Sequence, residues 1–527
     1  MEETSKRVLA RIEEGWKTAP LKVSEGPPGE IECEVPTDGV VDFASFVVKA
    51  LHGRLVSVVG QEEPAPVLRY LFSLPAEQVF VRVAVRLEPG HRRFPSLTPI
   101  VHAAHWYERE LHDLFGYEPV GHPHLDRLIL HSDWPEGTHP FRKSCNLTHP
   151  VPRSEAGGEG PALGRDGEFE LPFGPIRAGV VESAHFRFLT VGEEILKLEM
   201  QLFYKFRGIE RLFENQPLVL CPLVAERVSG ISSFAHSLAF CQAVERAAGI
   251  AVPRPACLLR TIYAELERIY NHLGNLAHLC EATSLRVGEA QCSLLKEYAK
   301  QFNAKLSGHR FLRGINAIGG VRRGLTAGQH RELLGAIDYI GRETKVLTDL
   351  ILSTKSHLDR LVTTGILPEK LAADYGAVGP VARGSGLPWD MRKDHPYAAY
   401  GDLTFNVPVY HYGDALARMR VRMDEIPESI QLIREAMDRF ELAEGDLVAP
   451  LPQIPAGRRA IGWAESPRGG LVVFVETGEG NTLRRCKVRS PSFCNWYLFQ
   501  ATVTQTMMMD WPINERSFGL THAGCDL

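Results

Sequence analysis

Two serines stand at the spacing at which proteins often place a pair of metal-binding cysteines. The stretch 226–237 reads ERVSGISSFAHS, and Ser229 and Ser232 in it are separated by two residues. A C-x-x-C pair at this spacing supplies thiolates, which bind zinc, iron–sulfur clusters and other soft metal centres. A serine hydroxyl has a pKa far above that of a thiol and is no soft anionic ligand at neutral pH. The stretch therefore has the spacing of a metal site without its ligands.

The cysteines of the chain do not supply a replacement. None of the ten forms a C-x-x-C pair; they are Cys33, Cys145, Cys221, Cys241, Cys257, Cys280, Cys292, Cys486, Cys494 and Cys525. Zinc and iron–sulfur sites usually take their ligands in closely spaced pairs. Scattered cysteines in a reducing compartment are most often small buried hydrophobic residues. We therefore expect no metal and no cluster bound by this chain.

Composition limits the classes of function. The chain has 527 residues, a net charge of −5 and 44% hydrophobic residues, which allows two to four domains with substantial cores. A general nucleic-acid binder would carry a basic face, so no nucleic-acid partner is expected. No apolar run reaches the ~18 residues that span a bilayer, and the charged start MEETSKRVLARIEEGWK lacks the apolar core of a signal peptide. These features predict a cytoplasmic protein.

The chain must position its polar residues on two unequal domains. Residues 31–100 mix β-rich runs, namely VVDFASFVV, RLVSVVG and QVFVRVAVRL, with an amphipathic helix, a pattern typical of a small α+β domain. Residues 144–172 are rich in Gly, Pro, Ser and Glu with little apolar periodicity. This composition predicts a linker between a first domain at 1–143 and a second at 173–527.

The second domain is predicted to be largely helical. Strands in a hairpin arrangement are expected from about 173 to 203, and long amphipathic helices from about 190 to 365, for example at 257–280, where apolar residues recur every three or four positions. A helix at about 413–442, a β-rich segment and a last helical stretch at 491–509 follow. The predicted fold class is α+β: a small N-terminal α+β domain, then a domain with a helical-bundle core and peripheral β-sheets.

Several motifs are specific enough to indicate a family. The run ERELHDLFGYEPVGHPHLDRLIL at 108–130 resembles the signature of the C subunit of respiratory complex I. Four others resemble the adjacent D subunit and the large subunits of membrane-bound group 4 [NiFe] hydrogenases: YKFRGIERLFE at 204–214, ELERIYNHL at 265–273, GPVARGSGLPWDMRKDHPY at 379–397 and GDALARMRVRMDEIPESI at 413–430. Their order, a fused C and D subunit, is similar to that of formate hydrogenlyase large subunits. The resemblance implies a hydrogenase-large-subunit-like second domain.

The same resemblance explains the two serines. In the hydrogenase relatives four cysteines hold nickel and iron, and these positions fall here on Ser229, Ser232, Thr521 and Gly524. Soft thiolates are needed to bridge both metals, so the resemblance implies an energy-converting-hydrogenase-related type that has lost its [NiFe] centre. The chain ends at Leu527, as the trimmed hydrogenase subunits do.

Complex I binds quinone in the corresponding cavity, and its headgroup partners are replaced as well. The signature histidine of complex I falls on Arg177, and its quinone-facing tyrosine falls on Gly230. Ordinary ubiquinone reduction is therefore also in doubt. The resemblance leaves a degenerate metal or quinone cavity formed by residues 177, 229, 230, 232, 521 and 524.

Three residues keep a type that could take part in catalysis. Arg227 matches a family arginine beside the terminal [4Fe–4S] cluster of the neighbouring subunit, where a cation would raise the cluster potential. Glu182 matches the glutamate that relays protons beside the hydrogenase metal site, which a carboxylate with a raised pKa can do. His236 lies on a predicted helix face. For each of the three, a structural role is the alternative: an ion pair, a solvent-facing strand residue and a satisfied core histidine.

These observations lead to one main hypothesis and two alternatives. The chain is expected to be a catalytic-type peripheral subunit of a membrane-bound complex I-like or hydrogenase-related oxidoreductase, of the NADH:quinone oxidoreductase type, that couples electron transfer to ion translocation. Expected partners are a cluster-carrying small subunit with a [4Fe–4S] cluster, a ferredoxin-like subunit, and antiporter-like and H-type membrane-arm subunits, at the cytoplasmic face of the inner membrane. A quinone or another acceptor would occupy the cavity. The alternatives are a non-redox structural adaptor and a quinone-type reductase; whether the chain is itself an enzyme stays open, but it is not expected to be a hydrogenase on its own.

Overall fold

The structure is a computed structural model and describes most of the chain. The described residues are 2–62, 65–88, 90–146, 150–154, 167–177, 182–440, 446–504 and 506–527. Most of the predicted linker at 144–172 lies outside these ranges, although β8 already begins within it, at Phe169. Within these ranges, no helix is both long and apolar enough to cross a membrane.

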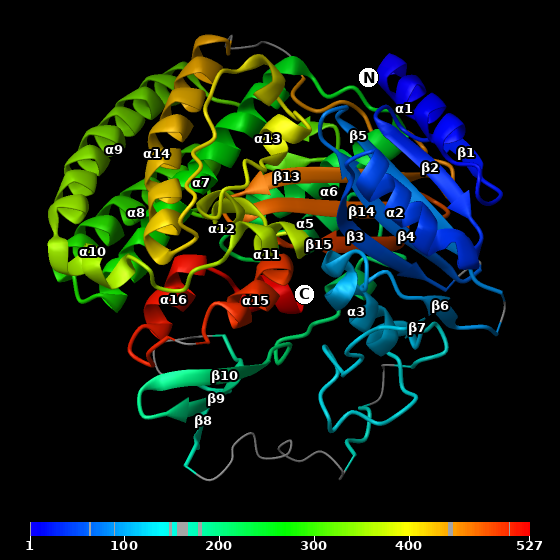
Figure 1. Cartoon of the computed structure of the whole chain (residues 1–527). Helices are drawn as coiled ribbons and strands as arrows, with labels where there is room; N and C mark the ends of the chain where they lie inside the picture. Colours follow the sequence, from blue (N-terminus) through cyan, green and yellow to red (C-terminus); the bar gives the residue numbers. More distant parts are fainter. Residues whose placement is uncertain are drawn as a thin grey trace.

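The N-terminal part is built on a five-stranded sheet with the order β1-β2-β5-β4-β3, in which only β2 and β5 run parallel (Figure 1). One face packs on α1 and α2, where Ile12 and Phe43 share a core with Tyr70. The elements are α1 (Glu2–Gly15), β1 (Lys22–Glu25), β2 (Glu30–Val35), α2 (Val40–Ala50), β3 (Arg54–Gln61), β4 (Val67–Leu74), β5 (Val79–Arg86), β6 (Arg93–Pro95), α3 (His105–Phe115) and β7 (Glu118–Val120). The predicted small α+β domain is confirmed.

One element in this part differs from the sequence-based expectation. The run VVDFASFVV, expected to be β-rich, forms helix α2. Its buried residues are Val40, Phe43, Ala44 and Val47, a spacing of three, one and three that places all four on one helical face. Packing of this face against the sheet overrides the preference of valine for strands.

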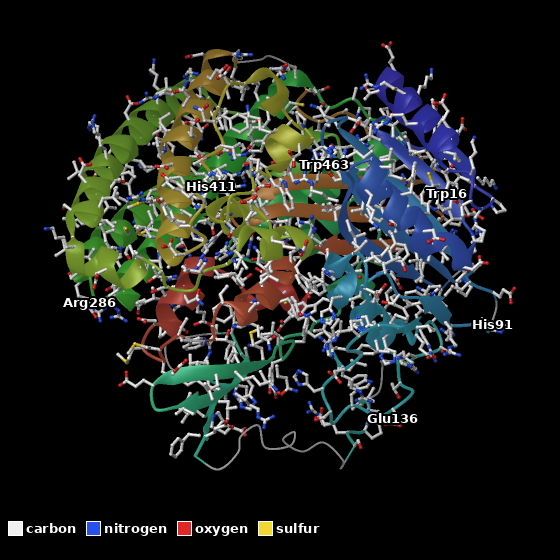
Figure 2. All side chains as sticks on the ribbon, viewed as in Figure 1. Trp16, His91, Glu136, Arg286, His411 and Trp463 are labelled. Carbon is white, nitrogen blue, oxygen red and sulfur yellow. The ribbon has the colours of Figure 1, made fainter. Side chains whose placement is uncertain are left out.

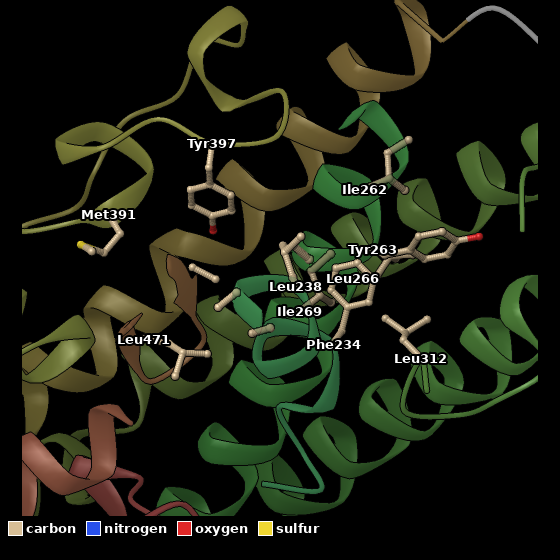
Figure 3. Close-up of a cluster of buried hydrophobic side chains, with 14 of the residues drawn as sticks. Phe234, Leu238, Ile262, Tyr263, Leu266, Ile269, Leu312, Met391, Tyr397 and Leu471 are labelled. Carbon is tan, nitrogen blue, oxygen red and sulfur yellow. The ribbon is translucent and has the colours of Figure 1, made fainter. Parts of the chain in front are cut away.

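The second part has a helical core, as predicted. Its longest helices are α7 (Arg254–Ala282), α8 (Arg286–Ser307), α9 (Ala327–Ser353) and α14 (Ala415–Asp438). Figure 3 shows side chains of α6 (Ser233–Ala248) and α7, including Phe234, Leu238 and Ile269, packed together in the centre of this core. Shorter helices are α4 (Ile209–Leu212), α5 (Cys221–Ala225), α10 (Lys355–Leu361), α11 (Glu369–Asp374), α12 (Gly379–Gly384), α13 (Met391–Asp394), α15 (Pro491–Ala501), α16 (Trp511–Phe518) and α17 (His522–Asp526).

The small sheets of the second part occupy different depths. The three-stranded sheet β8 (Phe169–Phe173), β9 (His185–Val191) and β10 (Glu194–Gln201) lies at the edge of the molecule (Figure 1), and its antiparallel β9–β10 pair confirms the predicted hairpin. A two-stranded ladder joins β11 (Asn316–Ala317) to β12 (Gly320–Val321). The sheet β13 (Arg459–Ser466), β14 (Gly469–Thr477) and β15 (Leu483–Arg489) is almost entirely buried.

This buried sheet connects the two parts of the molecule. On one side α6 packs so closely that a Cβ atom at Gly462 would lie 2.0 Å from the carbonyl oxygen of Ala239. On the other side lies the N-terminal sheet, whose Phe80 stacks obliquely on Trp463 with ring centroids 4.9 Å apart (Figure 2 labels Trp463). The N-terminal sheet is thus covered on both faces, which makes the two parts one continuous body.

Buried charges join the elements of the second part. Glu425 on α14 pairs with Arg383 on α12, lies 3.5 Å from Arg268 on α7, and accepts a 2.6 Å hydrogen bond from His272. The arginines hold the pKa of Glu425 well below its ordinary value against the effect of burial. Glu265, also on α7, binds Arg268 at 3.0 Å in the same network. Arg383 and Arg268 each have more than one carboxylate partner, so removing one charge would break several ion pairs in a low-dielectric interior.

We predict that Glu425→Gln destabilises the folded chain by about 3–5 kcal/mol, because it removes the buried charge that pairs with Arg383 and lies 3.5 Å from Arg268. Urea unfolding of the variant and the wild type gives the difference in free energy. Glu332→Gln, at an exposed position on α9, is the matched control and should change stability by less than about 0.5 kcal/mol. A change of control size in Glu425→Gln would contradict the prediction.

Candidate functional site

Most of the residues expected to form the degenerate cavity do surround one hollow. A cavity of about 550 Å³ is lined by Arg177, Glu182, Ser229, Gly230 and Thr521, all of them predicted site residues. Its walls come from the loop before α6, from α7 and α8, and from the C-terminal segment around α16 and α17. Residues as far apart in the sequence as Arg177 and His522, 345 positions, therefore meet at one place.

Arg177, at the position of the complex I histidine, is held by two partners. Its Nη1 donates to both oxygens of Glu515, at 2.9 and 3.2 Å, and its Nη2 lies 3.2 Å from Nε2 of His522. Burial and the nearby guanidinium lower the pKa of His522 to about 3. His522 is therefore neutral near pH 7, and because a guanidinium only donates, its Nε2 accepts and its Nδ1 carries the proton.

Glu182 caps the last helix. Its two carboxylate oxygens accept from the backbone N–H groups of His522 at 2.6 Å and Ala523 at 3.1 Å. These groups belong to the first turn of α17, where backbone donors have no partner within the helix. Glu182 is half-buried at the cavity wall, so the structure gives it a structural contact as well as access to the cavity.

The four positions that the resemblance assigns to metal-binding cysteines lie close together. A Cβ atom at Gly524 would be 3.7 Å from Cβ of Ser229. The hydroxyl of Thr521 accepts from the backbone N–H of Gly524 at 3.2 Å and so caps α17. Ser232 accepts from a guanidinium nitrogen of Arg468 at 3.3 Å. A [NiFe] centre would need four thiolates at these positions. They offer instead the hydroxyl groups of Ser229, Ser232 and Thr521, and Gly524 has no side chain that could bind a metal.

Arg468 was not recognised from the sequence, yet it forms part of the cavity wall. It lies in the two-residue turn between β13 and β14 and donates to Asn271 at 2.9 Å and to the carbonyl of Gly519 at 2.7 Å. Burial lowers the pKa of this guanidinium, and Glu182 is the first of the charges that oppose this effect. The sequence shows only an arginine in a hairpin turn; nothing in its spacing connects it to Ser232.

Four predicted residues are not among those that line the cavity: Ser232, Gly524, Arg227 and His236. The side chain of Arg227 is 56% exposed and binds the carbonyl of Leu223 at 2.8 Å. His236 is buried, and its Nδ1 donates to the carbonyl of Ser232 at 2.8 Å. Burial lowers the pKa of His236 to about 4, so this imidazole is neutral at pH 7. Its Nε2 is buried without a partner among the described residues.

The cavity has an excess of positive charge. The cationic side chains on its wall are Arg177, Lys296, Lys300, Arg468 and Arg516, and the carboxylates are Glu182, Glu281 and Glu515. The 2.9 Å ion pair between Arg177 and Glu515 neutralises one of these cations and one of these carboxylates. Four cations then face two carboxylates, which makes the hollow suited to an anion.

Comparisons with known proteins identify the family of the chain. A sequence profile of the 49 Kd subunit of respiratory-chain NADH dehydrogenase matches residues 292–460 and 446–527, and one of the 30 Kd subunit matches residues 33–151. Formate hydrogenlyase subunit 5 of Escherichia coli (strain K12) is 31% identical over 523 residues, covering 97% of this chain and 91% of the relative. The chain belongs to the complex I 30 and 49 kDa subunit family, in its fused form.

Other members of the complex I 30 and 49 kDa subunit family are similar over most of the chain. Hydrogenase-4 component G of Escherichia coli (strain K12) is 30% identical, covering 96% of this chain and 90% of the relative. The fused C/D subunit of the NADH-quinone oxidoreductase of Bacteroides fragilis (strain YCH46) is also 30% identical, covering 78% and 81%. The resemblance to fused C/D subunits and to group 4 hydrogenase relatives is thus confirmed.

A solved structure shows the same fold. A chain of the membrane-bound sulfane sulfur reductase, an archaeal respiratory membrane complex, superposes with a TM-score of 0.65 at 23% identity, covering 68% of this chain and 98% of that chain. The predicted fold class is confirmed by this likeness and by the mixture of helices and small sheets.

The residues of the cavity do not fit a nickel–iron centre. Such a centre needs thiolates, and the four family positions supply only hydroxyls and a glycine. Cys525 is adjacent in sequence, but burial raises the pKa of its thiol well above the ordinary value, which disfavours a thiolate ligand. In the part of the chain that the structure describes, no group of three or more His, Cys, Asp and Glu side chains could hold a metal ion.

We predict that His522→Gln makes the chain less sensitive to acid. The folded pKa of about 3 lies below the reference value of 6.5, so the unfolded state binds a proton first as the pH falls, and stability declines between pH 6.5 and pH 3. For one such histidine the loss between pH 7 and pH 5 is about 2 kcal/mol. Urea unfolding at both pH values should show a loss smaller by this amount in the variant.

The matched control for this prediction is His91→Gln. The side chain of His91 is 75% exposed at the edge of the molecule (Figure 2), so its substitution should leave the acid sensitivity as in the wild type. An equal loss of stability in His522→Gln and His91→Gln would show that His522 is not held neutral.

Proposed function

We propose that this chain is the large peripheral subunit of a membrane-bound, complex I-like oxidoreductase that works without a [NiFe] centre and reduces a small anionic acceptor in the 550 Å³ cavity. The observation that carries the proposal is the cavity itself. It has lost the thiolates of the hydrogenases and the quinone partners of complex I, yet it remains open and is lined by an excess of cations. A dead site under no constraint would not need to keep four cations around an open hollow.

The exposed surface next to Arg227 supports a cluster-carrying partner. Val219, Leu220 and Leu223 on and before α5 are exposed apolar residues, and Arg227 follows directly. In the family this arginine stands beside the terminal [4Fe–4S] cluster of the neighbouring subunit, so electrons would enter here. We infer that the small subunit docks on this surface and that the chain itself binds no cluster.

The further partners follow from the relatives. One relative is named as a formate hydrogenlyase subunit, and the structural neighbour belongs to a respiratory membrane complex. By analogy, this chain would assemble with a ferredoxin-like subunit and with antiporter-like and H-type membrane-arm subunits, at the cytoplasmic face of the inner membrane. Reduction of the acceptor would then drive ion translocation in that arm.

The cavity residues have separate roles in this proposal. Arg468 would bind the anionic acceptor, because its guanidinium is buried and hydrogen-bonded only to neutral groups. Glu182 would exchange protons with the cavity, since it combines solvent access with contact to α17. His236 is not needed in either role: its Nδ1 is already bonded to Ser232.

We predict that the purified complex contains no stoichiometric nickel in this subunit and neither takes up nor evolves hydrogen. The reason is the donor set at Ser229, Ser232, Thr521 and Gly524, which offers no thiolate. Metal analysis by mass spectrometry and hydrogen-dependent dye reduction measure the two quantities. Nickel near one atom per chain together with hydrogen-dependent activity would overturn the metal-free proposal.

A second prediction separates redox function from a purely structural role. Arg468→Met should raise the KM for an anionic acceptor about 10- to 100-fold, the effect of losing one charged hydrogen bond, and should leave the potential of the neighbouring cluster unchanged. Arg227→Met should do the reverse: it should lower the cluster potential by tens of millivolts, because a nearby cation favours the reduced form. Glu182→Gln should slow turnover without changing that potential, because an amide cannot relay a proton.

Redox titration and steady-state kinetics of complexes purified to equal yield give these values. If the chain is instead a non-redox adaptor, the three variants will change only the yield of assembled complex. If it is a quinone-type reductase, a neutral quinone will be reduced as fast by Arg468→Met as by the wild type.

A further inference from the structure

A second cavity lies between the N-terminal sheet and the helical part. Its volume is about 320 Å³, at the lower end of the range of ligand pockets, roughly 300–1,000 Å³. It shares no lining residue with the cavity that contains Arg468. One wall comes from β3 and the segment before α3, and the other from α11, α12, α13 and the β13–β15 sheet. Neither part of the chain forms this cavity alone.

Much of the wall of this interdomain cavity is apolar. Val56, Ile100, Trp389 and Met391 are among its lining residues. A smaller pocket continues from it, because Val56, Ala103, Arg489 and three other residues line both. An apolar wall of this size favours a ligand with a hydrocarbon or aromatic body.

The carboxylates at the interdomain cavity are already neutralised. Asp394 pairs with Arg54, and Asp374 pairs with Lys370 at 2.5 Å. Asp390 binds Arg392 at 2.7 Å. The fourth carboxylate, Glu465, binds Arg383 at 2.9 Å. Each of the four thus has a cationic partner other than Arg489, and Arg383 is shared between Glu465 and Glu425.

Arg489 is a cation at the wall of this cavity that has no ion-pair partner in the described part of the chain. It is 4% exposed and lines both the interdomain cavity and the smaller pocket. Its Nε donates to the carbonyl of Val56 at 2.8 Å, and its Nη1 donates to the carbonyl of Gly470. Among the described residues, no acceptor binds its Nη2 and no carboxylate pairs with it. Burial lowers the pKa of the nearby Arg54, and the charge of Arg489 adds to this effect, whereas Asp394 and Glu465 oppose it.

A second buried arginine, Arg418, differs from Arg489 in its hydrogen bonds. Arg418 is also buried without an ion pair, but all three of its guanidinium nitrogens donate to acceptors, on Ser517, Gly413 and Asn514. Arg489 keeps one nitrogen unused at the wall of an open cavity. A buried charge without a counter-ion is costly, and a ligand that brings one negative charge would remove that cost.

We propose that the interdomain cavity binds a small amphipathic monoanion, with its carboxylate-type group at Arg489 and its apolar body against Val56, Ile100 and Met391. A single charge fits because only one cation at the wall has no carboxylate partner. Since both parts of the chain form the wall, the bound ligand also holds the N-terminal sheet against the helical part. This inference does not depend on the function proposed for the first cavity.

The test compares two probes that differ only in charge. Octanoate and 1-octanol have the same eight-carbon body, and their affinities for the purified full chain can be measured by isothermal titration calorimetry. Octanoate should bind about 10- to 100-fold more tightly than octanol, because one hydrogen bond to a charged group contributes a free energy of this size. Arg489→Met should remove this difference and leave octanol binding unchanged, whereas Arg489→Lys should preserve the preference for octanoate.

Two control variants locate the binding. Ala103→Phe adds a ring at a position that lines both pockets and should weaken both probes without removing a charge. Arg468→Met, in the other cavity, should leave both affinities as in the wild type. If Arg468→Met alone abolishes octanoate binding, the anion occupies the first cavity and this proposal is wrong, while the function proposed for that cavity gains support.

A measurement on the unchanged chain avoids any effect of substitution on folding. Cys494 lines the smaller pocket, whereas Cys145 lies in neither pocket and is also partly exposed. Octanoate should slow the alkylation of Cys494 by N-ethylmaleimide, followed by peptide mass spectrometry, and should not affect Cys145. Equal affinity of the wild type for octanoate and octanol, or no protection of Cys494, would overturn the proposal.

Discussion

The structure depends most on the buried ionic network around Glu425. Carboxylates and guanidinium groups from α7, α12, α13, α14 and β13 meet there with almost no exposure to solvent. Charges of this kind are stable in the interior only when each has its partner and its hydrogen bonds. The five elements are therefore fixed in their relative positions by charge pairing, in addition to the apolar packing shown in Figure 3.

The elements that carry this network also form walls of both cavities. Glu265 and Arg268 on α7 belong to the network. The next turn of the same helix contains Tyr270 and Asn271, which line the first cavity. On the other side of the network Asp390 and Glu465 face the interdomain cavity. Arg468 follows Glu465 by three residues, in a turn where Gly469 is needed because a Cβ atom would lie 2.6 Å from the backbone nitrogen of Gly379. A change in the network would thus be felt at both sites.

At the first cavity, the polypeptide's own hydrogen bonds involve residues that the resemblance places at metal-ligand positions. The hydroxyl of Thr521 and the carboxylate of Glu182 bind backbone N–H groups of α17, and Arg468 binds Ser232. Arg468 also donates to the carbonyl of Gly519, so it links the C-terminal segment to the loop before α6. The cavity next to them stays open, and its positive charge is what directs the proposed function toward an anionic acceptor.

The sequence by itself determined the family and the α+β class, because these depend on residue types in order along the chain, and on the same basis it predicts the loss of the thiolates. The confirmed family rests on runs such as 108–130 and 265–273, and the long helices on apolar periodicity. Periodicity was ambiguous for 40–48, where β-branched residues suggested a strand and packing produced α2. Only the tertiary structure decided the rest. It placed Arg468 beside Ser232 and left Arg489 unpaired at an interdomain cavity, because contacts between residues hundreds of positions apart are set by how whole elements pack, and not by local spacing.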